Sequence, residues 1–503
     1  MKLRAPFMAA MMAMGVPVLA FLMACSAPAQ ETSQLSQRLD AFLSAAETSH
    51  FSGAVLVARG DEVLFSKGYG FADYESGVKV TPETVFNIGS VTKQFTAAAI
   101  LKLVEHEHLD LSDTLGALFE NVPEDKAGIT VHQLLTHTAG ISRQDLGFRY
   151  DPASKEDFLA AFFASTLATD PGTRHEYANT GYVLLAAIVE QVSGQTFEAY
   201  LQQHLLEPAG LSQTGYLQPD WRSERIANGY YFDLPTGAWK SWGNTFQQWG
   251  VGPVTWFGIG KGDLHSTTGD LYNWHKALRD GTVLAPETVA LLQTPHVPEN
   301  EKDTTFYGYG WSIQSTNDGG RIITHNGSNG LFFADFIRFV DEDLVVILLT
   351  NVSQPESADS IAWHLARMAR DESYVPPPIA PLSYELVYRF MDGHTASEAG
   401  GLPSFMETGL GRPLENAAIL NRVGFQLLRE DKCDWSTALL QLNTDLFPTD
   451  GNLRDSLGEG LLACGQSAEA ADAFRKALEL APEENCYWCQ NANEKLGQIF
   501  GAP

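Results

Sequence analysis

Strand-like segments lie at the two ends of a long, mostly helical stretch of this chain, and that placement limits the folds it can adopt. Residues 52–58 and 63–69 predict a β-hairpin. Four later segments predict three or four more strands, at 307–314, 321–325, 331–340 and 344–350, and helix-like segments flank the strands at 34–50 and 357–370. A sheet must bury its apolar faces against other layers. We therefore expect an α+β fold, in which strands from both ends form one antiparallel sheet flanked by helices and the mostly helical middle is inserted between them.

Ser90 and Lys93 are the first candidates for chemistry. They follow a short apolar run at 85–89 and open a segment, 94–104, that predicts a buried helix. Residues three apart share a helix face, so the Lys93 amine can reach the Ser90 hydroxyl. The unpaired N–H groups and the positive dipole end of the first turn favour negative charge there. The pair predicts a serine nucleophile for acyl transfer, whereas the alternative is a helix-capping serine beside a solvated lysine.

A second Ser-x-x-Lys sequence runs from Ser76 to Lys79. It contains Gly77 and lies in a turn-like stretch between two strand patterns, so its serine and lysine are not expected to share a helix face. We expect this copy to have no catalytic role.

Two further polar motifs follow along the chain. Tyr177-Ala178-Asn179 lies between a turn and a helix-like run, where it would offer a phenol and an amide. His325-Asn326-Gly327 ends one strand-like segment, and its glycine has no Cβ to block a substrate lying along the strand edge. Taken alone, a Tyr-x-Asn is usually a turn and a single histidine is usually structural. The order of the three motifs is more informative than any one of them.

That order and spacing resemble the serine β-lactamase and penicillin-binding-protein superfamily, over about residues 35–370. The chain looks closest to the class C branch, which also holds D-aminopeptidases, DD-carboxypeptidases and carboxylesterases of family VIII type. Flanking runs at 86–96, 134–140 and 307–311 strengthen the resemblance. It implies a β-lactamase/transpeptidase-like domain at 34–372, with its active site in the cleft between the sheet and the helical part.

The resemblance also implies a role for each matching residue. Ser90 matches the acylated nucleophile, and Lys93 matches its partner in proton transfer. Tyr177 matches the general base, with a phenol pKa expected to be lowered by nearby positive charge. Asn179 would orient Lys93 and a substrate carbonyl. The backbone N–H groups of Ser90 and Ser328 would form the oxyanion hole, and water would then cleave the acyl-enzyme.

The third motif departs from the β-lactamase pattern. True class C lactamases carry Lys-Thr-Gly where this chain has His325-Asn326-Gly327. Histidine is mostly neutral at pH 7, so it should attract the carboxylate of a penicillin less strongly than lysine does, unless local acids hold His325 protonated. This favours an esterase or a D-amino-acid peptidase with His325 and Gly327 in the substrate site. A β-lactamase, or a penicillin-binding receptor or scaffold with slow or no turnover, is the alternative.

Residues 1–29 predict an export signal, with a basic start followed by an apolar stretch. Two processing sites compete in it. Residues 22–25 resemble a bacterial lipobox, which would place a lipid on Cys25, whereas cleavage after Ala29 would release a soluble protein. We expect a periplasmic or outer-membrane lipoprotein, held to a membrane only by a lipid on Cys25. A soluble secreted form and a retained transmembrane helix are the alternatives.

The chain is acidic, with 33 lysines and arginines against 61 aspartates and glutamates and a formal net charge of −28. Such a chain is a poor partner for nucleic acid or an anionic membrane surface. No glycine-rich phosphate loop follows a strand, and the histidines at 106 and 108 lack a third ligand at a useful spacing. We expect no metal and no nucleotide cofactor.

We expect His137 to be a buried, hydrogen-bonded residue.

The last part of the chain predicts a separate helical domain. A proline-rich linker at 373–382 precedes residues 383–503, which contain a 34-residue periodicity. Two copies, about 417–450 and 451–484, resemble tetratricopeptide repeats, helix pairs whose small residues permit close packing. Two repeats are few for a free solenoid, so we expect this all-α domain to dock on the catalytic domain, with a possible protein partner for the repeats.

Four of the five cysteines lie in this helical tail. In an oxidising compartment, disulfides are the natural interpretation. Cys433 and Cys464 fall near the turns of adjacent repeats and could form a bridge. Cys486 and Cys489 could form a local disulfide or a redox pair, and a structural zinc site is the least favoured alternative.

Residues 216–257 contain 11 aromatic residues, five of them tryptophan, among glycines and prolines. The favoured interpretation is that these side chains pack a long irregular segment. The functional alternative is an apolar wall of the active-site cleft that selects acyl or aryl groups.

Overall fold

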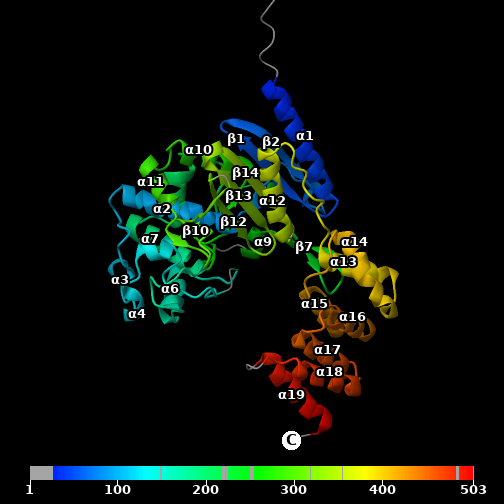
Figure 1. The fold of residues 1–503 in the computed structure, drawn as a ribbon. Coiled ribbons are helices and arrows are strands. Elements are labelled where there is room, and N and C mark those ends of the chain that lie inside the picture. The colour runs from blue at the N-terminus through cyan, green and yellow to red at the C-terminus, as the bar shows by residue number, and fades with distance from the viewer. Residues whose placement is uncertain are drawn as a thin grey trace, which may run out of the picture.

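The structure is a computed structural model, and it describes residues 27–147, 150–217, 221, 225–249, 254–317, 319–353, 355–482 and 486–501. Most of the predicted export signal, including Cys25, lies outside these residues. In Figure 1 a central sheet carries α1 (Ala27–Glu47) and α12 (Pro355–Arg370) on one side and the helices of the middle region on the other. The C-terminal helices extend away from this body as a separate arm (Figure 1).

The central sheet has eight strands in the order β2-β1-β14-β13-β12-β11-β10-β9, and every neighbouring pair is antiparallel. Its strands are β1 Gly53–Arg59, β2 Glu62–Tyr69, β9 Val297–Pro298, β10 Thr305–Tyr307, β11 Ser312–Ser315, β12 Arg321–Ser328, β13 Phe333–Phe339 and β14 Leu344–Thr350. The first strand pairs with the last along its whole length, from Gly53 opposite Thr350 to Arg59 opposite Leu344. The predicted α+β class and antiparallel sheet are confirmed.

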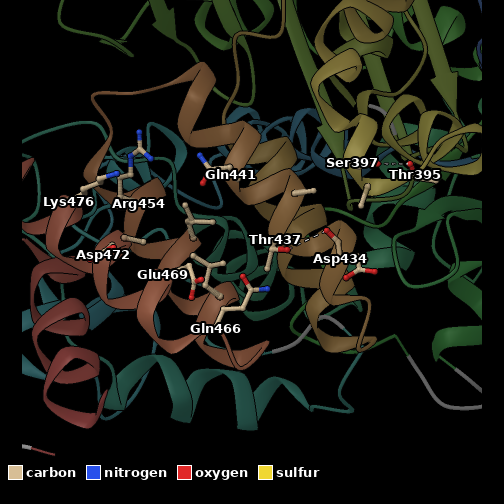
Figure 2. Close-up of a pocket in the computed structure, with 15 residues that line it drawn as sticks. Thr395, Ser397, Asp434, Thr437, Gln441, Arg454, Gln466, Glu469, Asp472 and Lys476 are labelled. Atoms are coloured by element: carbon tan, nitrogen blue, oxygen red, sulfur yellow. Dashed lines mark hydrogen bonds between the residues drawn. The ribbon is translucent and has the colours of Figure 1, made fainter. Parts of the chain in front are cut away.

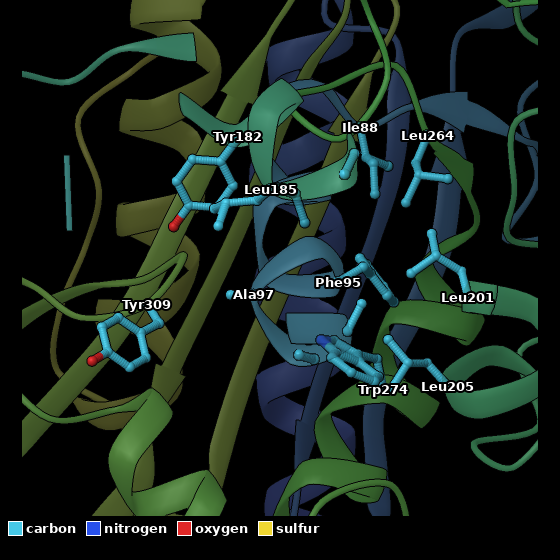
Figure 3. Close-up of a cluster of buried hydrophobic side chains, with 14 of the residues drawn as sticks. Ile88, Phe95, Ala97, Tyr182, Leu185, Leu201, Leu205, Leu264, Trp274 and Tyr309 are labelled. Carbon is cyan, nitrogen blue, oxygen red and sulfur yellow. The ribbon is translucent and has the colours of Figure 1, made fainter. Parts of the chain in front are cut away.

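Alternating side chains of the sheet enter two different cores. On β1, Ala54 and Leu56 face the helical middle region, while Val55 and Val57 face α1 and α12. This is the period of two that a strand imposes. Strand β14 is buried on both faces, which explains its continuous apolar sequence. Figure 3 shows part of the core on the helical side, where Phe95 and Trp274 stack with ring centroids 4.5 Å apart.

The middle region supplies most of the helices on that side. Its helices are α2 Thr92–Glu105, α3 Leu115–Leu118, α4 Glu124–Ala127, α5 Val131–Leu135, α6 Lys155–Ala164, α7 Asn179–Ser193, α8 Phe197–Leu201, a π-helical turn at Gln202–Leu206, α9 Thr245–Trp249, α10 Thr268–Arg279 and α11 Pro286–Leu292. Short strands accompany them: β3 Phe71–Asp73, β4 Val78–Lys79, β5 Phe86–Asn87, β6 Gly229–Asp233, β7 Ala238–Gly243 and β8 His265–Ser266. The buried helices α2 and α7 pack together, and each begins at one of the polar motifs, α2 directly after the turn Gly89–Val91 and α7 at Asn179.

Two predicted strand boundaries are wrong. The segment 307–314 forms two strands, β10 and β11, because a turn at residues 308–311 reverses the chain. Gly310 in this turn has a φ of 74°, and a Cβ on it would lie 2.7 Å from the backbone oxygen of Lys93. A glycine is therefore required there. Strand β12 continues past its predicted end at His325 to Ser328, pairing with β13.

The C-terminal residues form an all-helical region. Its helices are α13 Ser383–Gly393, a 3₁₀ helix at Ala396–Gly401, α14 Leu402–Leu410, α15 Ala418–Arg429, α16 Cys433–Leu446, α17 Gly451–Ala463, α18 Ser467–Glu479 and α19 Tyr487–Phe500. Close packing recurs with the 34-residue period. A Cβ on Gly424 would lie 2.8 Å from Leu440, and one on Gly458 would lie 2.6 Å from Phe474. Assignment of these helix pairs to the tetratricopeptide class stays a prediction.

The helical region contacts the rest of the molecule through the β6–β7 hairpin. Phe232 and Leu234 of this hairpin join the core formed by α13 to α16, and the Tyr388 hydroxyl donates a hydrogen bond to the backbone oxygen of Leu234. On the same side, His50 contacts Glu385 at 3.2 Å and packs against Trp239. Part of the aromatic stretch at 216–257 is therefore used to hold the C-terminal region in place.

A groove of about 800 Å³ lies among the C-terminal helices (Figure 2). Acidic and basic side chains from α16, α17 and α18 line it together, among them Asp434, Arg454, Glu469, Asp472 and Lys476. This mixed lining does not favour a ligand of either charge. The expected protein partner of the repeats stays a prediction.

All four cysteines of the tail form disulfides. Cys433 at the start of α16 is bonded to Cys464 at the end of α17, which ties one helix pair to the next. Cys486 and Cys489 are bonded at the start of α19. Among the described residues, no helix is both long and apolar enough to cross a lipid bilayer.

Candidate active site

Ser90 lies at a sharp transition from strand to helix. It is the middle residue of the 3₁₀ turn Gly89–Val91, which leads directly into α2. Before the turn, the side chain of Asn87 accepts a hydrogen bond from the Gly89 N–H at 2.9 Å and donates to Asp263 at 3.0 Å. These bonds fix the turn, so the partly exposed Ser90 hydroxyl stands at the beginning of a buried helix.

Lys93 is fully buried behind Ser90. Its Nζ donates to Ser90 Oγ at 3.0 Å, to Asn179 Oδ1 at 3.0 Å and to the backbone oxygen of Lys261 at 2.6 Å. The predicted reach of Lys93 to Ser90 across one helical turn is present, and Asn179 opens α7 on the far side of the amine. Three acceptors therefore fix the amine beside the hydroxyl.

The Tyr177 phenol completes the group around Ser90. It shares a hydrogen bond with the Ser90 side chain, and the Lys93 Nζ lies 4.9 Å from its ring centroid. Burial raises the pKa of Tyr177 and outweighs the opposing effect of that hydrogen bond. The expected lowering of this pKa is therefore wrong, because the loss of hydration of a buried phenolate dominates and the charges of Asp145 and Glu299 raise the pKa further. In the resting site Tyr177 is a neutral phenol.

His325 is buried on β12 and neutral. Its Nδ1 lies 2.5 Å from the backbone oxygen of Asn326 and carries the proton, so its Nε2 accepts from the Tyr307 hydroxyl at 3.1 Å. Burial, assisted by the charge on Lys93, lowers the pKa of His325 from 6.5 to about 4. At neutral pH His325 carries no charge that could attract a carboxylate, which agrees with the expectation from the replacement of lysine by histidine in the third motif.

Two glycines bring β12 against the turn that carries Ser90. Gly89 has a φ of 50°, and a Cβ on it would lie 2.6 Å from the backbone nitrogen of Ser328. A Cβ on Gly327 would lie 2.2 Å from the Ile88 oxygen and 2.6 Å from the Ser90 nitrogen. Only glycine fits at both positions, and the backbone nitrogens of Ser90 and Ser328 flank this contact. Two N–H donors so placed can stabilise one oxyanion.

One cavity of about 440 Å³ unites these groups, and its lining includes Ser90, Tyr177, Tyr307, His325, Gly327 and Ser328. Lys93 and Asn179 lie directly behind Ser90. None of the described residues that line this cavity comes from the aromatic stretch at 216–257, so the proposed apolar wall is absent from the described lining. Phe246 and Trp249 instead pack around His265.

His137 supports the site from within. It is buried with a φ of 55°, and its Nδ1 accepts the Ala178 N–H at 3.2 Å, as expected for a hydrogen-bonded core histidine. Its ring centroid lies 4.3 Å from that of Tyr177 and 4.8 Å from that of Tyr307. The histidine thereby holds both phenols in place.

The sequence interpretation missed three carboxyl groups in the same cavity, those of Glu299, Asp335 and Asp359. Asp335 carried a usable signal, because it is a single charged residue in the otherwise apolar strand segment 331–336. Nothing in the local sequence around Glu299 or Asp359 distinguishes either from a surface acid. Their position depends on how β10, β13 and α12 come together.

The low pKa of His325 predicts a dependence of stability on pH. Between pH 6.5 and about 4 the unfolded chain binds a proton that the folded chain excludes, so the stability due to neutral His325 is complete above pH 6.5 and is lost as the pH falls toward 4. His325→Gln is expected to reduce this loss by about 3 kcal/mol. Urea unfolding at a series of pH values measures this loss of folding stability. The exposed His108, changed to Gln, is the control, and equal pH profiles for wild type and His325→Gln would contradict the assignment.

The family model described as Beta-lactamase matches residues 35–370, which is more than half of the chain. The chain belongs to the beta-lactamase family. This is a family of serine hydrolases that includes penicillin-binding proteins, so the β-lactamase/transpeptidase-like fold implied by the three motifs is confirmed.

The relatives of this beta-lactamase family member are distant. Penicillin-binding protein 4* of Bacillus subtilis is 28% identical over 316 residues, covering 61% of this chain and 69% of its own. The octameric penicillin-binding protein homologue from Pyrococcus abyssi has a TM-score of 0.59 at 26% identity, covering 71% of this chain and 82% of its own. The D-amino acid amidase from Ochrobactrum anthropi shares the fold, with a TM-score of 0.56 at 20% identity over 67% of this chain and 99% of its own.

Proposed function

We propose that the protein is a serine hydrolase that cleaves a carboxylic ester or an amide through an acyl-Ser90 intermediate, as an esterase or D-amino-acid peptidase of the class C-like branch. The arrangement of Lys93 carries this proposal: its buried amine lies 3.0 Å from the Ser90 hydroxyl and 3.0 Å from the Asn179 oxygen. A lysine with a purely structural role would not need to contact a serine hydroxyl that lines a cavity. Here the amine, the hydroxyl and the Tyr177 phenol form one hydrogen-bonded group.

Acylation would begin with attack of Ser90 Oγ on the substrate carbonyl carbon. Lys93, which donates three hydrogen bonds as an ammonium group in the resting site, would first release one proton to solvent. The Ser90 hydroxyl proton would then pass to the neutral Lys93 amine as the new C–O bond forms. The N–H groups of Ser90 and Ser328 would stabilise the oxyanion, each contributing about 3 kcal/mol in the transition state. The neutral Tyr177 phenol would donate its proton to the leaving group as the scissile bond breaks. Tyr177 then regains a proton from Lys93.

Deacylation would reverse these proton movements with water as the nucleophile. Water gives a proton to the acid–base unit formed by Lys93 and Tyr177 and attacks the carbonyl carbon of acyl-Ser90. The free acid is released, while Ser90 Oγ recovers its proton. The high pKa of Tyr177 suits a group that donates a proton rather than one that persists as an anion. Tyr177 and Lys93 therefore act together as one acid–base unit.

The lining of the cavity disfavours efficient β-lactam hydrolysis. His325 is neutral, and the described lining residues include three carboxyl groups but no lysine or arginine, so the carboxylate of a penicillin finds no cation there. Penicillin binding remains the second candidate, because a curated relative carries the name penicillin-binding protein 4*. In that case the serine would be acylated with slow or no turnover.

The cellular location belongs to the proposal as well. The basic and apolar start of the chain supports export to the periplasm, with a lipid on Cys25 holding the protein at the outer membrane. The disulfides Cys433–Cys464 and Cys486–Cys489 suit an oxidising compartment. Metabolic labelling with a radioactive fatty acid, compared between wild type and Cys25→Ala, tests the anchor.

Mass spectrometry and a substrate panel test the proposed chemistry. Purified protein would be treated with a fluorophosphonate and with penicillin, and separately assayed on p-nitrophenyl esters, D-amino acid amides and nitrocefin. We expect a fluorophosphonate adduct on the peptide that contains Ser90, together with turnover of an ester or amide. A stable penicillin adduct without turnover would instead identify a receptor. Absence of any adduct and any turnover would refute the proposal.

A further inference from the structure

Besides the groups that act on Ser90, acidic side chains line the same cavity. The acids are Glu299, Asp335 and Asp359, which line it together with Trp363. None of these four residues has a place in the proton transfers described above. We call this part of the cavity the carboxyl end of the cleft.

The topology of the sheet explains how these side chains reach one cavity. The pairing of β12 with β11 ends at Thr324, while its pairing with β13 continues to Ser328. The edge of β12 at 325–328 is therefore free of β11, and groups on both faces of the sheet reach the cavity at this edge. Asp335 on β13 stands opposite Asn326, and α12 packs against β13 and brings Asp359.

Asp335 is the most deeply buried of the acids, because it is only 1% exposed. Its carboxyl accepts a hydrogen bond from the Phe336 N–H and, through Oδ1 at 3.5 Å, one from the Thr324 hydroxyl. Its buried Oδ2 receives no hydrogen bond from an N–H or hydroxyl donor of the described residues. Burial raises the pKa of Asp335 and of Asp359, and the two carboxyls can hydrogen-bond each other only while one of them holds a proton. When both are ionised, no lysine or arginine of the described cavity lining compensates their charge.

Hydrogen bonds fix the positions of the other two acids of the carboxyl end, Glu299 and Asp359. The Ser312 hydroxyl donates to Glu299 Oε2 at 2.5 Å, and Asp359 is hydrogen-bonded by the side chains of Asn326 and Trp363. Trp363 is only partly buried, so its indole can contact a cation that lies beside Asp359. An indole beside carboxylates suits an alkylammonium group.

A metal ion fits this end of the cleft poorly. No three His, Cys, Asp or Glu side chains in the described part of the chain converge closely enough to hold one. Carboxyls that are spread along a cleft suit a larger cation, which shares its charge among several oxygens through three N–H donors.

We propose that the carboxyl end of the cleft is a subsite for an ammonium group of the substrate, bound by Asp335, Asp359 and Glu299 while Ser90 attacks the ester or amide. This inference rests on the proposed function and specifies its substrate class: amides and esters that carry a free primary amine. Two sources of that amine fit the chemistry, the α-amino group of an amino acid derivative and the amine of a lysine-like side chain.

Matched substrates separate these possibilities. p-Nitrophenyl or amide substrates with one acyl chain would carry a free α-amine, a free side-chain amine, an N-acetylated amine or a carboxylate. We expect the wild type to favour one of the two free amines over its acetylated form by about tenfold or more in kcat/KM, and to disfavour the carboxylate. Whichever amine is favoured identifies the source. Equal rates for amine and acetylated substrates would overturn the inference while leaving the proposed function intact.

Variants of the acids test whether these residues cause the preference for amine substrates. Asp359→Asn and Glu299→Gln should reduce about tenfold the preference for the amine, measured as the ratio of kcat/KM for the amine to kcat/KM for the acetylated substrate. Circular dichroism spectra equal to that of the wild type would report correct folding. Glu301→Gln, an exposed acid two residues from Glu299, is the matched control. An unchanged preference in Asp359→Asn would overturn the assignment of the carboxyl end.

A binding experiment measures the affinity of the subsite for an ammonium group without any turnover. Calorimetric titration of butylammonium chloride, against sodium chloride of equal ionic strength, should give saturable binding to the wild type and weaker binding to Asp359→Asn. Failure of all substrates with retained butylammonium binding would refute the proposed function alone. No saturable binding, together with no preference for amines, would refute the subsite.

Discussion

Replacement of Ser90 by alanine is expected to lower kcat for ester or amide hydrolysis by about 10⁴-fold or more, with the fold unchanged. The hydroxyl is the atom that Lys93 and Tyr177 both contact, so its removal leaves the proton-transfer groups without a nucleophile. Losses of this size are typical when the nucleophile of a serine hydrolase is removed, and the remaining rate comes from substrate binding and the oxyanion donors. Single-turnover kinetics with an activated ester measure the loss.

The chain provides its own matched control. Ser76 and Lys79 repeat the Ser-x-x-Lys spacing, but Ser76 lies in an exposed turn and hydrogen-bonds Asp73 at 2.7 Å. Ser76→Ala should therefore retain the full rate. If Ser90→Ala kept a rate similar to that of Ser76→Ala, the acyl-enzyme mechanism would be wrong. Equal circular dichroism spectra for both variants would exclude unfolding as the cause of a loss.

Replacement of Gly327 by alanine is expected to lower kcat/KM by about 100-fold, which is the effect of losing one oxyanion donor. The added Cβ would lie 2.2 Å from the Ile88 oxygen and 2.6 Å from the Ser90 nitrogen, so β12 must move away from the turn. That movement separates the Ser90 and Ser328 N–H groups. Because the effect lies in the transition state, kcat should fall more than KM rises.

A different glycine controls for the substitution itself. A Cβ on Gly128 would meet no atom within 4 Å, and the residue has a φ of −86°, which any amino acid adopts. Gly128→Ala should leave kcat/KM unchanged. A Gly327→Ala variant with wild-type kcat and a normal melting temperature would show that the contact between β12 and the Ser90 turn does not position the oxyanion donors.

Much of this structure could be predicted because its signals are local. The period of two in residues 52–69 and the apolar run at 344–350 directly predicted β1, β2 and β14. The Ser90 and Lys93 spacing predicted a contact that follows from helix geometry alone. In each case, neighbours in the sequence determine the outcome.

Features that depend on distant segments were missed. The pKa of Tyr177 depends on how completely the folded chain buries the phenol, and the sequence suggested only the charge nearby. The acids Glu299 and Asp359 join Ser90 only after β10 and α12 pack against the sheet. Likewise, the turn at Gly310 that divides 307–314 is required by the approach of Lys93, which is far away along the chain.

The pairing of β1 with β14 has a consequence for biosynthesis. A nascent chain emerges from the ribosome with β1 early, but the partner that covers one edge of β1 is complete only when Thr350 has been added. Contacts between such distant residues form slowly, because a long loop must close first. The two ends of the sheet therefore cannot pair until Thr350 has been synthesised, so the sheet is completed late in translation.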